Sequence, residues 1–567
     1  MIRNTIIYLP IWMLFLFTSC SKDFLERAPS DFIGKEEVFS SLANAEAFLT
    51  NAYRDVPSIY IESPGNTLFN LGAGTDEGVS MLYEAVLGTT KFNYNDWNPS
   101  AFPMQSRWAQ YYRSIRRINM FIENNHLIPN EAQEGSTTVR IKERLLGEAY
   151  ALRALFYFQL FKMWGEVPII THVIDPGGEE TFYPREPIGN VIDLIKEDLA
   201  KAVAILPARL DAANNGRMNA TFCHALLSRV LLYYASPLFN PNNDVARWQA
   251  ALQATETAMQ FAENNNFTLS RGESNGLQAY ERIFLQLDNP EVIMHSVDFS
   301  FEDNFWGWEH YTHSLGYGGW HVEAPIQEFV DAYETDKGVS PVLGYDANNK
   351  QLVNPESDYN PQEPYAHRDP RFYQTILYHG AQWKGRAVDI RRGGRDFNED
   401  RPRILYYWRK YCTESYNLTT NSGFVPKKFV LFRLGELYLN YAEALNESLS
   451  APDNRVYDAV NEIRSRSDMP GLPTGLDKNQ MRERIRHERR IEFAVENQRF
   501  WDVRRWKIAE ITDNGPVRKV EVSANGEFTY PIYHQRRFDP ARNYLFPIPQ
   551  LEIDKTDGVL SQNPGWN

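Results

Sequence analysis

The sequence predicts a mainly α-helical fold in which helices pack as antiparallel pairs. Apolar residues recur at three- and four-residue steps over about 35–265 and again over about 427–510, a pattern typical of helices with one buried face. Between these two regions, about 270–426 is rich in Asn, Gly, Pro and Tyr and shows little periodicity. Loops this long in a compact protein are usually functional. We therefore expect a helical scaffold with a large loop-rich insertion on the ligand side.

The first helical region contains three helices with clear ends. One begins at Ile141 and continues until Gly165 and Pro168 stop it. The segments 188–207 and 219–237 follow the same periodicity, and each closes at a proline, which cannot continue a helix. Paired antiparallel helices are the natural packing for such segments.

The second region resumes with helices over 429–448 and 454–468, followed by a long helix over 479–510. Leu434, Gly435 and Tyr438 match half of a tetratricopeptide helix, but the partner helix starts later than a 34-residue repeat permits. The scaffold is therefore interpreted as repeat-like. In the C-terminal segment 511–567, "KVEVSANGEFTY" alternates around Asn525-Gly526 and predicts a small β-hairpin with a type I′ turn.

The N-terminus predicts export and lipidation. Residues 1–19 combine Arg3, an apolar run from Ile6 to Phe17 and two small residues before Cys20, as in a secretory signal peptide. "LFTSC" resembles a bacterial lipobox, although Phe17 stands where Leu is usual. We expect residues 20–567 to form one mature domain, anchored by acyl chains on Cys20.

Composition argues against several functions. A net charge of −14 disfavours general nucleic-acid binding. Cys223 and Cys412 cannot form a disulfide framework in so long a chain, and we expect two buried thiols. No Gly-x-Ser-x-Gly elbow or phosphate-binding loop is present. We expect no cofactor.

Several charged motifs have structural interpretations. "HERRI" at His487 lacks the second histidine of a zinc protease motif. The arginines from Arg482 to Arg505 alternate with glutamates, and Arg484 and Glu488 are spaced as an i to i+4 ion pair. Glu309, His310 and His313 include metal-ligand types, but we expect polar contacts there and no metal.

Seven segments in order carry a family resemblance: "CSKDFLERAPSD", "EAYALRALFYFQLFKMWGEVP", "HRDPRFYQTILYHG", "FRLGELYLNYAEALNE", "VNEIRSRSDMPGL", "ERRIEFAVENQRFWDVRRW" and "YLFPIP…QNPGW". Together they resemble SusD/RagB-type outer-membrane lipoproteins over residues 20–566. The resemblance implies a helical fold with tetratricopeptide-like pairs and no enzymatic activity. It also implies a cell-surface, outer-membrane location and a SusC-like TonB-dependent transporter as partner, to which captured oligosaccharide or peptide is delivered.

The aromatic stretch "FWGWEHYTHSLGYGGW", residues 305–320, is the predicted ligand platform. Flat aromatic faces match the C–H faces of pyranose rings, so Trp306, Trp308, Tyr311, Tyr317 and Trp320 are candidate ligand contacts. Trp97, within "NYNDWNPS", is a second candidate because amide and acid groups surround it. The alternative is that some of these rings cover the helical core, as we expect for Trp108, Tyr111 and Tyr112.

The leading hypothesis is thus a non-catalytic glycan-binding lipoprotein. A peptide ligand with the same transporter is the first alternative. A secreted glycoside hydrolase is the second, and it would need a pair of carboxylates that sequence alone does not reveal.

Overall fold

The structure is a computed structural model that describes residues 35–566, except for 58–60, 64–66, 82–87, 130–140, 175–181, 212–213, 275, 287, 296–306, 398–402 and 424–428. The expected signal peptide, Cys20 and Trp306 lie outside the described residues. The fold is mainly helical, as predicted, and its strands form two-stranded antiparallel pairs.

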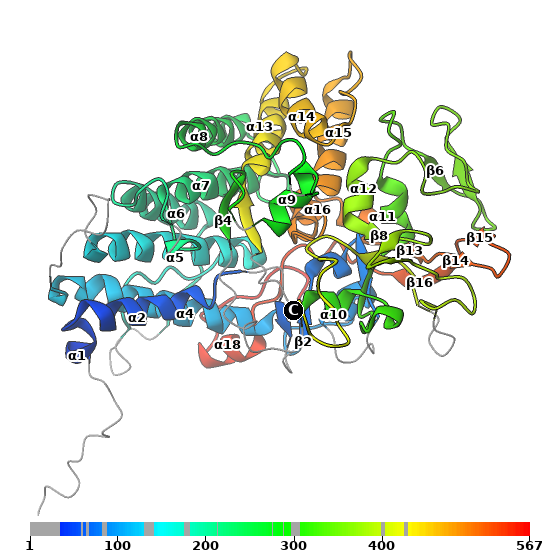
Figure 1. The fold of residues 1–567 in the computed structure, drawn as a ribbon. Coiled ribbons are helices and arrows are strands. Elements are labelled where there is room, and N and C mark those ends of the chain that lie inside the picture. Colours follow the sequence, from blue (N-terminus) through cyan, green and yellow to red (C-terminus); the bar gives the residue numbers. More distant parts are fainter. Residues whose placement is uncertain are drawn as a thin grey trace, which may run out of the picture.

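The helical scaffold is a stack of helices that come from the N-terminal and the C-terminal parts of the chain. Figure 1 shows the helices stacked from α2 and α4 through α5, α6 and α7 to α8, α13, α14 and α15. The scaffold helices are α1 (Lys35–Phe39), α2 (Leu42–Tyr53), α3 (Gly88–Tyr94), α4 (Gln105–Asn124), α5 (Ile141–Trp164), α6 (Ile188–Val203), α7 (Ala220–Ala235), α8 (Val245–Asn264), α13 (Leu434–Ser448), α14 (Asn454–Arg466), α15 (Lys478–Glu492), α16 (Gln498–Arg505), α17 (Ala509–Thr512) and α18 (Gln550–Lys555).

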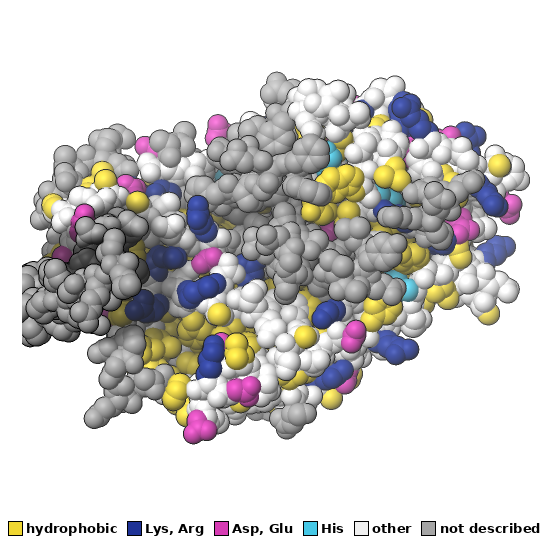
Figure 2. Space-filling view, turned by 90° about the horizontal axis from the view of Figure 1, so that it is seen from below, with side chains coloured by type: hydrophobic (Ala, Val, Ile, Leu, Met, Phe, Trp, Pro, Cys, Tyr) yellow, Lys and Arg dark blue, Asp and Glu magenta, His cyan; other side chains and the backbone are white. Residues whose placement is uncertain are grey.

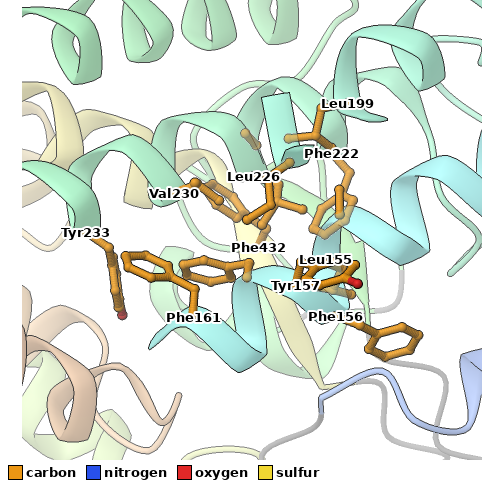
Figure 3. Packing of buried hydrophobic residues seen from close by; sticks show 14 of the residues in the cluster. Leu155, Phe156, Tyr157, Phe161, Leu199, Phe222, Leu226, Val230, Tyr233 and Phe432 are labelled. Carbon is orange, nitrogen blue, oxygen red and sulfur yellow. The ribbon is translucent and has the colours of Figure 1, made fainter. Parts of the chain in front are cut away.

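Apolar faces at helical spacing form the scaffold core. In Figure 3, Phe161 of α5 lies near Val230 of α7 and Phe432 of β12, and Phe156 of α5 stacks on Tyr111 of α4. The predicted ends of α5 and α7 are confirmed, since α5 stops at Trp164 and α7 stops at Ala235. The same core includes Trp566 at the other end of the chain. The two helical regions therefore share one core.

The prediction of one continuous helix over 479–510 is wrong, because the structure has separate helices there. The chain leaves the helix after Glu492, and Val495 and Asn497 adopt left-handed backbone angles of φ 68° and 60°. Left-handed residues cannot continue a right-handed helix. α15 and α16 are therefore separate helices.

The insertion contains short helices, short strand pairs and an aromatic core of its own. Its helices are α9 (Ala279–Leu285), α10 (Trp308–Thr312), α11 (Gln327–Ala332) and α12 (Pro370–Thr375). The strand pairs in and around it are β3 (Gly78–Ser80) with β5 (Glu323–Pro325), β4 (Val292–His295) with β12 (Val430–Arg433), β6 (Val342–Tyr345) with β7 (Gln351–Val353), β8 (Ile376–Leu377) with β11 (Tyr407–Trp408), and β9 (Gln382–Trp383) with β10 (Arg386–Ala387). Low sequence periodicity here reflects short elements, not an absence of packing.

Three further pairs complete the sheet inventory of the described residues: β1 (Ile61–Ser63) with β2 (Thr67–Phe69), β13 (Gly515–Arg518) with β16 (Ile532–Arg536), and β14 (Glu521–Val522) with β15 (Phe528–Thr529). The pairing of β14 with β15 confirms the predicted hairpin. Its turn is not type I′, because Gly526 has φ 87° but Asn525 is absent from the residues with positive φ. A type I′ turn needs positive φ at both positions.

Buried ion pairs join the scaffold to the insertion. Glu492 on α15 accepts hydrogen bonds from Arg371 of the insertion at 3.0 Å, from Arg433 of β12 at 2.6 Å and from Arg466 of α14 at 2.5 Å. Burial alone would raise the pKa of Glu492, but the guanidinium groups of Arg466, Arg433 and Arg371 hold it below its ordinary value. The arginine-rich segment thus serves a structural role, as the sequence indicated.

Candidate functional site

The expected platform begins in the described residues at Gly307 and runs through α10 and a 3-10 turn, Leu315–Tyr317, to Trp320. Gly318 has φ +84°, and a Cβ atom at Gly319 would collide with the carbonyl of His313. Both glycines are therefore needed to fold the chain back on α10. This turn places Trp320 beside the helix.

Trp320 stays partly exposed, as does Tyr317 of the same segment. Its backbone N–H donates to the His310 carbonyl at 2.6 Å. Its indole meets the Tyr311 ring at a centroid distance of 5.6 Å, edge to face, and the His310 ring at 5.5 Å. Tyr311, Val322 and Trp320 form a small cluster separate from the large cores.

The guanidinium of Arg403 holds the main chain at Trp320. It donates to the carbonyls of Trp320 at 2.8 Å and His321 at 2.5 Å. His321 itself adopts φ 52°. Trp320 is thus held in place by its main chain, while its side chain remains partly open to solvent.

Two of the predicted ligand contacts are instead core residues. Trp308 is 1% exposed, lies in the insertion core, and donates its indole N–H to the Lys410 carbonyl at 2.9 Å. Trp97 is 4% exposed and packs against Trp566 at a centroid distance of 4.5 Å in the scaffold core. Neither ring presents a face to solvent. The interpretation of these two as stacking surfaces is therefore corrected.

The remaining predicted rings lie around α10 in different environments. Tyr311 is buried beside Trp320. Tyr317 is half-buried, its hydroxyl donates to the Trp383 carbonyl at 3.1 Å, and the Arg386 guanidinium lies 3.7 Å from its ring centroid. One face of Tyr317 is thus already occupied. The structure brings Tyr311 and Trp320 together, but it places Trp97 in another core.

A polar loop that the sequence analysis did not single out lies beside the platform. A bridge between Asn417 and Ser422 closes this loop, and its side chains at Asn417, Thr419, Thr420, Asn421 and Ser422 are exposed. Thr419 packs against Gly318, and the ring of Tyr416 meets His310 at 5.7 Å. The hydroxyl- and amide-rich run "NLTTNS" was the available signal, but sequence alone did not place it against Gly318.

The acidic and imidazole groups of α10 are used within the protein. Glu309 accepts from Lys384 Nζ at 3.0 Å and from the Thr413 N–H at 2.9 Å. His313 Nε2 accepts from the indole N–H of Trp383 at 2.9 Å, and burial lowers the pKa of His310. Within the part of the chain that the structure describes, no group of three or more metal-ligating side chains was found.

The strand pair β3 with β5 brings the N-terminal part of the chain to the same place. The N–H of Met81 donates to the Val322 carbonyl at 2.6 Å. Glu323 of β5 is buried and accepts from the Asn70 N–H at 2.8 Å, and burial raises its pKa to about 8. The site therefore rests on a rigid base of paired strands.

Two carboxylates beside the loop are engaged in ion pairs. Glycoside hydrolysis uses one protonated carboxyl group and one free carboxylate across the bond to be cleaved. Beside the loop, Glu309 is paired with Lys384, and Asp396 is paired with Arg386 at 2.7 Å. An aromatic ring next to hydroxyl and amide groups suits a polyhydroxylated ligand.

Comparisons with known proteins cover nearly the whole chain. Residues 290–566 match the model described as the SusD family, and residues 23–232 match the model described as starch-binding associating with outer membrane. A SusD-like protein of Formosa agariphila, P38, is 25% identical over 551 residues, which cover 94% of this chain and 97% of that protein.

Solved structures agree with the fold. The crystal structure of a SusD-like protein from Bacteroides fragilis has a TM-score of 0.76 and 29% identity, and the match covers 93% of this chain and 98% of that one. A laminarin binding SusD-like protein has a TM-score of 0.62 and 22% identity, over 93% of this chain and 100% of that one.

Proposed function

Because this chain belongs to the SusD family, whose members include carbohydrate-binding proteins, we propose that it captures an oligosaccharide or polysaccharide at the cell surface without cleaving it. In this proposal a SusC-like TonB-dependent transporter in the outer membrane receives the ligand. Acyl chains on Cys20 hold the protein at that membrane.

The partly exposed Trp320 is the observation that carries the proposal. An indole face offers a flat, electron-rich surface to the C–H groups of a pyranose. The exposed amides and hydroxyls of the 417–422 loop, which lies against Gly318 of the same segment, suit the hydrogen bonds of sugar hydroxyl groups. Tyr311 packs edge to face against the Trp320 ring, and Tyr317 lies in the same segment. Both remain proposed contacts.

Two similarities guide the choice of the first ligands to test. One matching family model is described as starch-binding, and one structural neighbour is described as laminarin binding. Both polymers are glucans, so soluble starch and laminarin are suitable first probes.

Binding and cleavage are separated in one experiment. The purified chain from residue 21 onward is titrated with starch and with laminarin by calorimetry, and the glycans recovered afterwards are sized by chromatography. We expect saturable binding to a glycan and no change in its length. Shortened products would show a hydrolase, and binding of peptides with no binding across a panel of glycans would favour the peptide alternative.

A further inference from the structure

A cavity lies where the two helical regions of the scaffold meet, and we call it the α5–α16 cavity. Its volume is about 70 Å³. One water molecule needs roughly 10 to 15 Å³ of such space, so the cavity has room for an ion of several atoms. The side chains that line it come from α5, α7, α13 and α16 and include Gln159, Lys162, Arg229, Tyr233, Glu436 and Trp501.

Lys162 of α5 lines this cavity without a hydrogen bond or an ion pair to any residue that the structure describes. Its Nζ atom lies 4.5 Å from the ring centroid of Trp501 and 5.4 Å from that of Phe158. On the face of the molecule seen in Figure 2, other lysine and arginine side chains are spread over the surface, where water solvates them. Lys162 is instead partly buried between helices, so its ammonium group depends on what the cavity offers.

The two carboxylates that line the cavity are committed to other cations. Glu436 accepts hydrogen bonds from Arg229 Nε at 2.6 Å and from Arg229 Nη2 at 2.5 Å. Glu496 accepts from Lys410 Nζ at 2.8 Å. The positive charge of Lys162 is therefore left without a carboxylate of its own.

Three further polar groups in the lining have no partner in the described part of the chain. Gln159 is 2% exposed, and its Oε1 atom accepts no hydrogen bond. Nη1 of Arg229 and the hydroxyl of Tyr233 form none either. Buried polar groups are nearly always hydrogen bonded. Because the Gln159 amide can rotate to present its oxygen or its N–H groups, all three groups can bond to one occupant of the cavity.

An anion would offset the cost of burying the Lys162 charge. Burial, together with the nearby Arg229, lowers the pKa of Lys162 well below its ordinary value. A negative group at hydrogen-bond distance favours the charged ammonium, and hydrogen bonds between charged groups are the stronger ones. An oxyanion can accept from the ammonium, from the Arg229 guanidinium and from the Tyr233 hydroxyl at the same time.

We propose that the α5–α16 cavity binds a small carboxylate of the size of formate or acetate, with Lys162 and Arg229 as its charged partners. The volume suits such an ion and is far below the roughly 300 Å³ at which pockets for larger ligands begin. Since α5 and α7 come from the N-terminal part of the chain and α13 and α16 from the C-terminal part, the bound ion joins the two halves of the scaffold. The site uses none of the residues around Trp320 and does not depend on the proposed glycan binding.

Unfolding in urea tests the site with formate and acetate as probes. The chain from residue 21 onward is unfolded near neutral pH in equal concentrations of sodium formate, sodium acetate or sodium chloride. A ligand that binds only the folded state lowers the unfolding equilibrium constant, and we expect the carboxylates to lower it at least about fivefold relative to chloride. Lys162→Met should remove this difference. The control is Lys196→Met on α6, an exposed lysine beside Asp193, which should retain it.

Binding is also measured directly by the line broadening of isotopically labelled formate in NMR spectra. The formate signal should broaden with the parent and with Lys196→Met, and it should stay sharp with Lys162→Met. Lys162→Gln keeps a polar side chain without the charge, should behave like Lys162→Met, and carries the comparison if the methionine variant does not fold. Equal unfolding of the parent in the three salts with a sharp formate signal would overturn the proposal and leave the cavity to water. A carboxylate effect that survives both Lys162 variants would place the ion elsewhere and overturn it as well.

Discussion

At the scale of single residues, burial separates the aromatic side chains that the sequence could not tell apart. Trp308 and Trp320 lie twelve positions apart in the same glycine-rich stretch, yet Trp308 is in a core and Trp320 is partly exposed. Local composition predicted a cluster of rings here, and the structure brings Tyr311 and Trp320 together but places Trp308 in the insertion core. Composition could not predict which ring would pack under Lys410, because that contact joins segments about a hundred residues apart.

Trp320 and Trp308 form a matched pair of tests. Trp320→Ala should weaken glycan binding by about 2 kcal/mol, the cost of removing an aromatic anchor, with only a small fall in melting temperature. Trp308→Ala should lower the free energy of unfolding by about 3 to 5 kcal/mol, because it empties a buried site. Calorimetric titration and thermal unfolding of both variants check this. A large stability loss with intact affinity for Trp320→Ala would move that ring into the core.

Glu323 predicts a pH dependence of stability. Burial raises its pKa from 4.5 to about 8 in the folded protein, so the folded state keeps a proton that the unfolded chain loses above about pH 4.5. The unfolded state therefore binds fewer protons between these values, and this group's stabilising contribution is lost as pH rises, by up to about 1.4 kcal/mol per pH unit. Glu323→Gln should match the parent near pH 4 and be more stable than the parent at pH 8.

Urea unfolding of the parent and Glu323→Gln at pH 4, 6 and 8 measures this difference. Glu77, whose pKa burial and the neighbouring Asp76 raise to about 8, provides a second variant, Glu77→Gln, with the same expected sign. A difference between Glu323→Gln and the parent that stays constant across the three pH values would show that Glu323 is ionised in the folded protein.

At the scale of elements, the sequence predicted the long periodic helices well and the short elements poorly. The ends of α5 and α7 follow from prolines, glycines and an asparagine cap, which act locally. The break between α15 and α16 has no proline or glycine to mark it. Asn70 donates to the Val495 carbonyl, and the Leu71 N–H donates to Asn497 at 2.7 Å, so contacts from more than four hundred residues away accompany the turn.

The expected pairing of Arg484 with Glu488 illustrates the same limit. Arg484 instead lies 2.7 Å from Glu334, and Glu488 accepts from Arg371 at 2.5 Å and Arg464 at 3.0 Å. Spacing on one helix predicts only which side chains can meet on that helix. Here insertion residues and α14 provide the partners, and the expected exposed pair is replaced by buried ones.

Glu488→Gln should therefore lower the free energy of unfolding far more than the loss of an exposed ion pair would. Removing one charge from a buried pair leaves Arg371 and Arg464 less compensated and typically costs about 3 to 5 kcal/mol. The control is Glu483→Gln, whose side chain is 67% exposed beside Arg486 and should cost less than about 1 kcal/mol. Chemical denaturation of both variants gives the two values. Equal stability of the two would mean that the buried network contributes little.

At the scale of the whole molecule, the sequence predicts that the protein is attached to the membrane through acyl chains on Cys20. Cys20 lies outside the described residues, and of the described helices none is long and apolar enough to cross a bilayer. Acyl chains contribute roughly 0.8 kcal/mol per buried CH₂. Cys20→Ala should therefore abolish acylation and release the protein from washed membranes, as measured by immunoblotting of membrane and soluble fractions. Retention of the variant in the membrane fraction would indicate another anchor.

The two hydrophobic cores predict that residues 20–567 unfold as one unit. The scaffold core draws on Phe39 near the start of the described chain and Trp566 near its end, so the first helices cannot be buried without the last ones. Glu492 then ties the scaffold to the insertion through Arg371. When buried contacts connect all parts, opening one part exposes the others, and unfolding becomes cooperative.

Differential scanning calorimetry should show a single transition whose calorimetric and van't Hoff enthalpies agree, and residues 35–289 expressed alone should lack a cooperative transition. Two resolved transitions in the full chain, or a stable 35–289 fragment, would instead show that the helical scaffold and the insertion are independent domains.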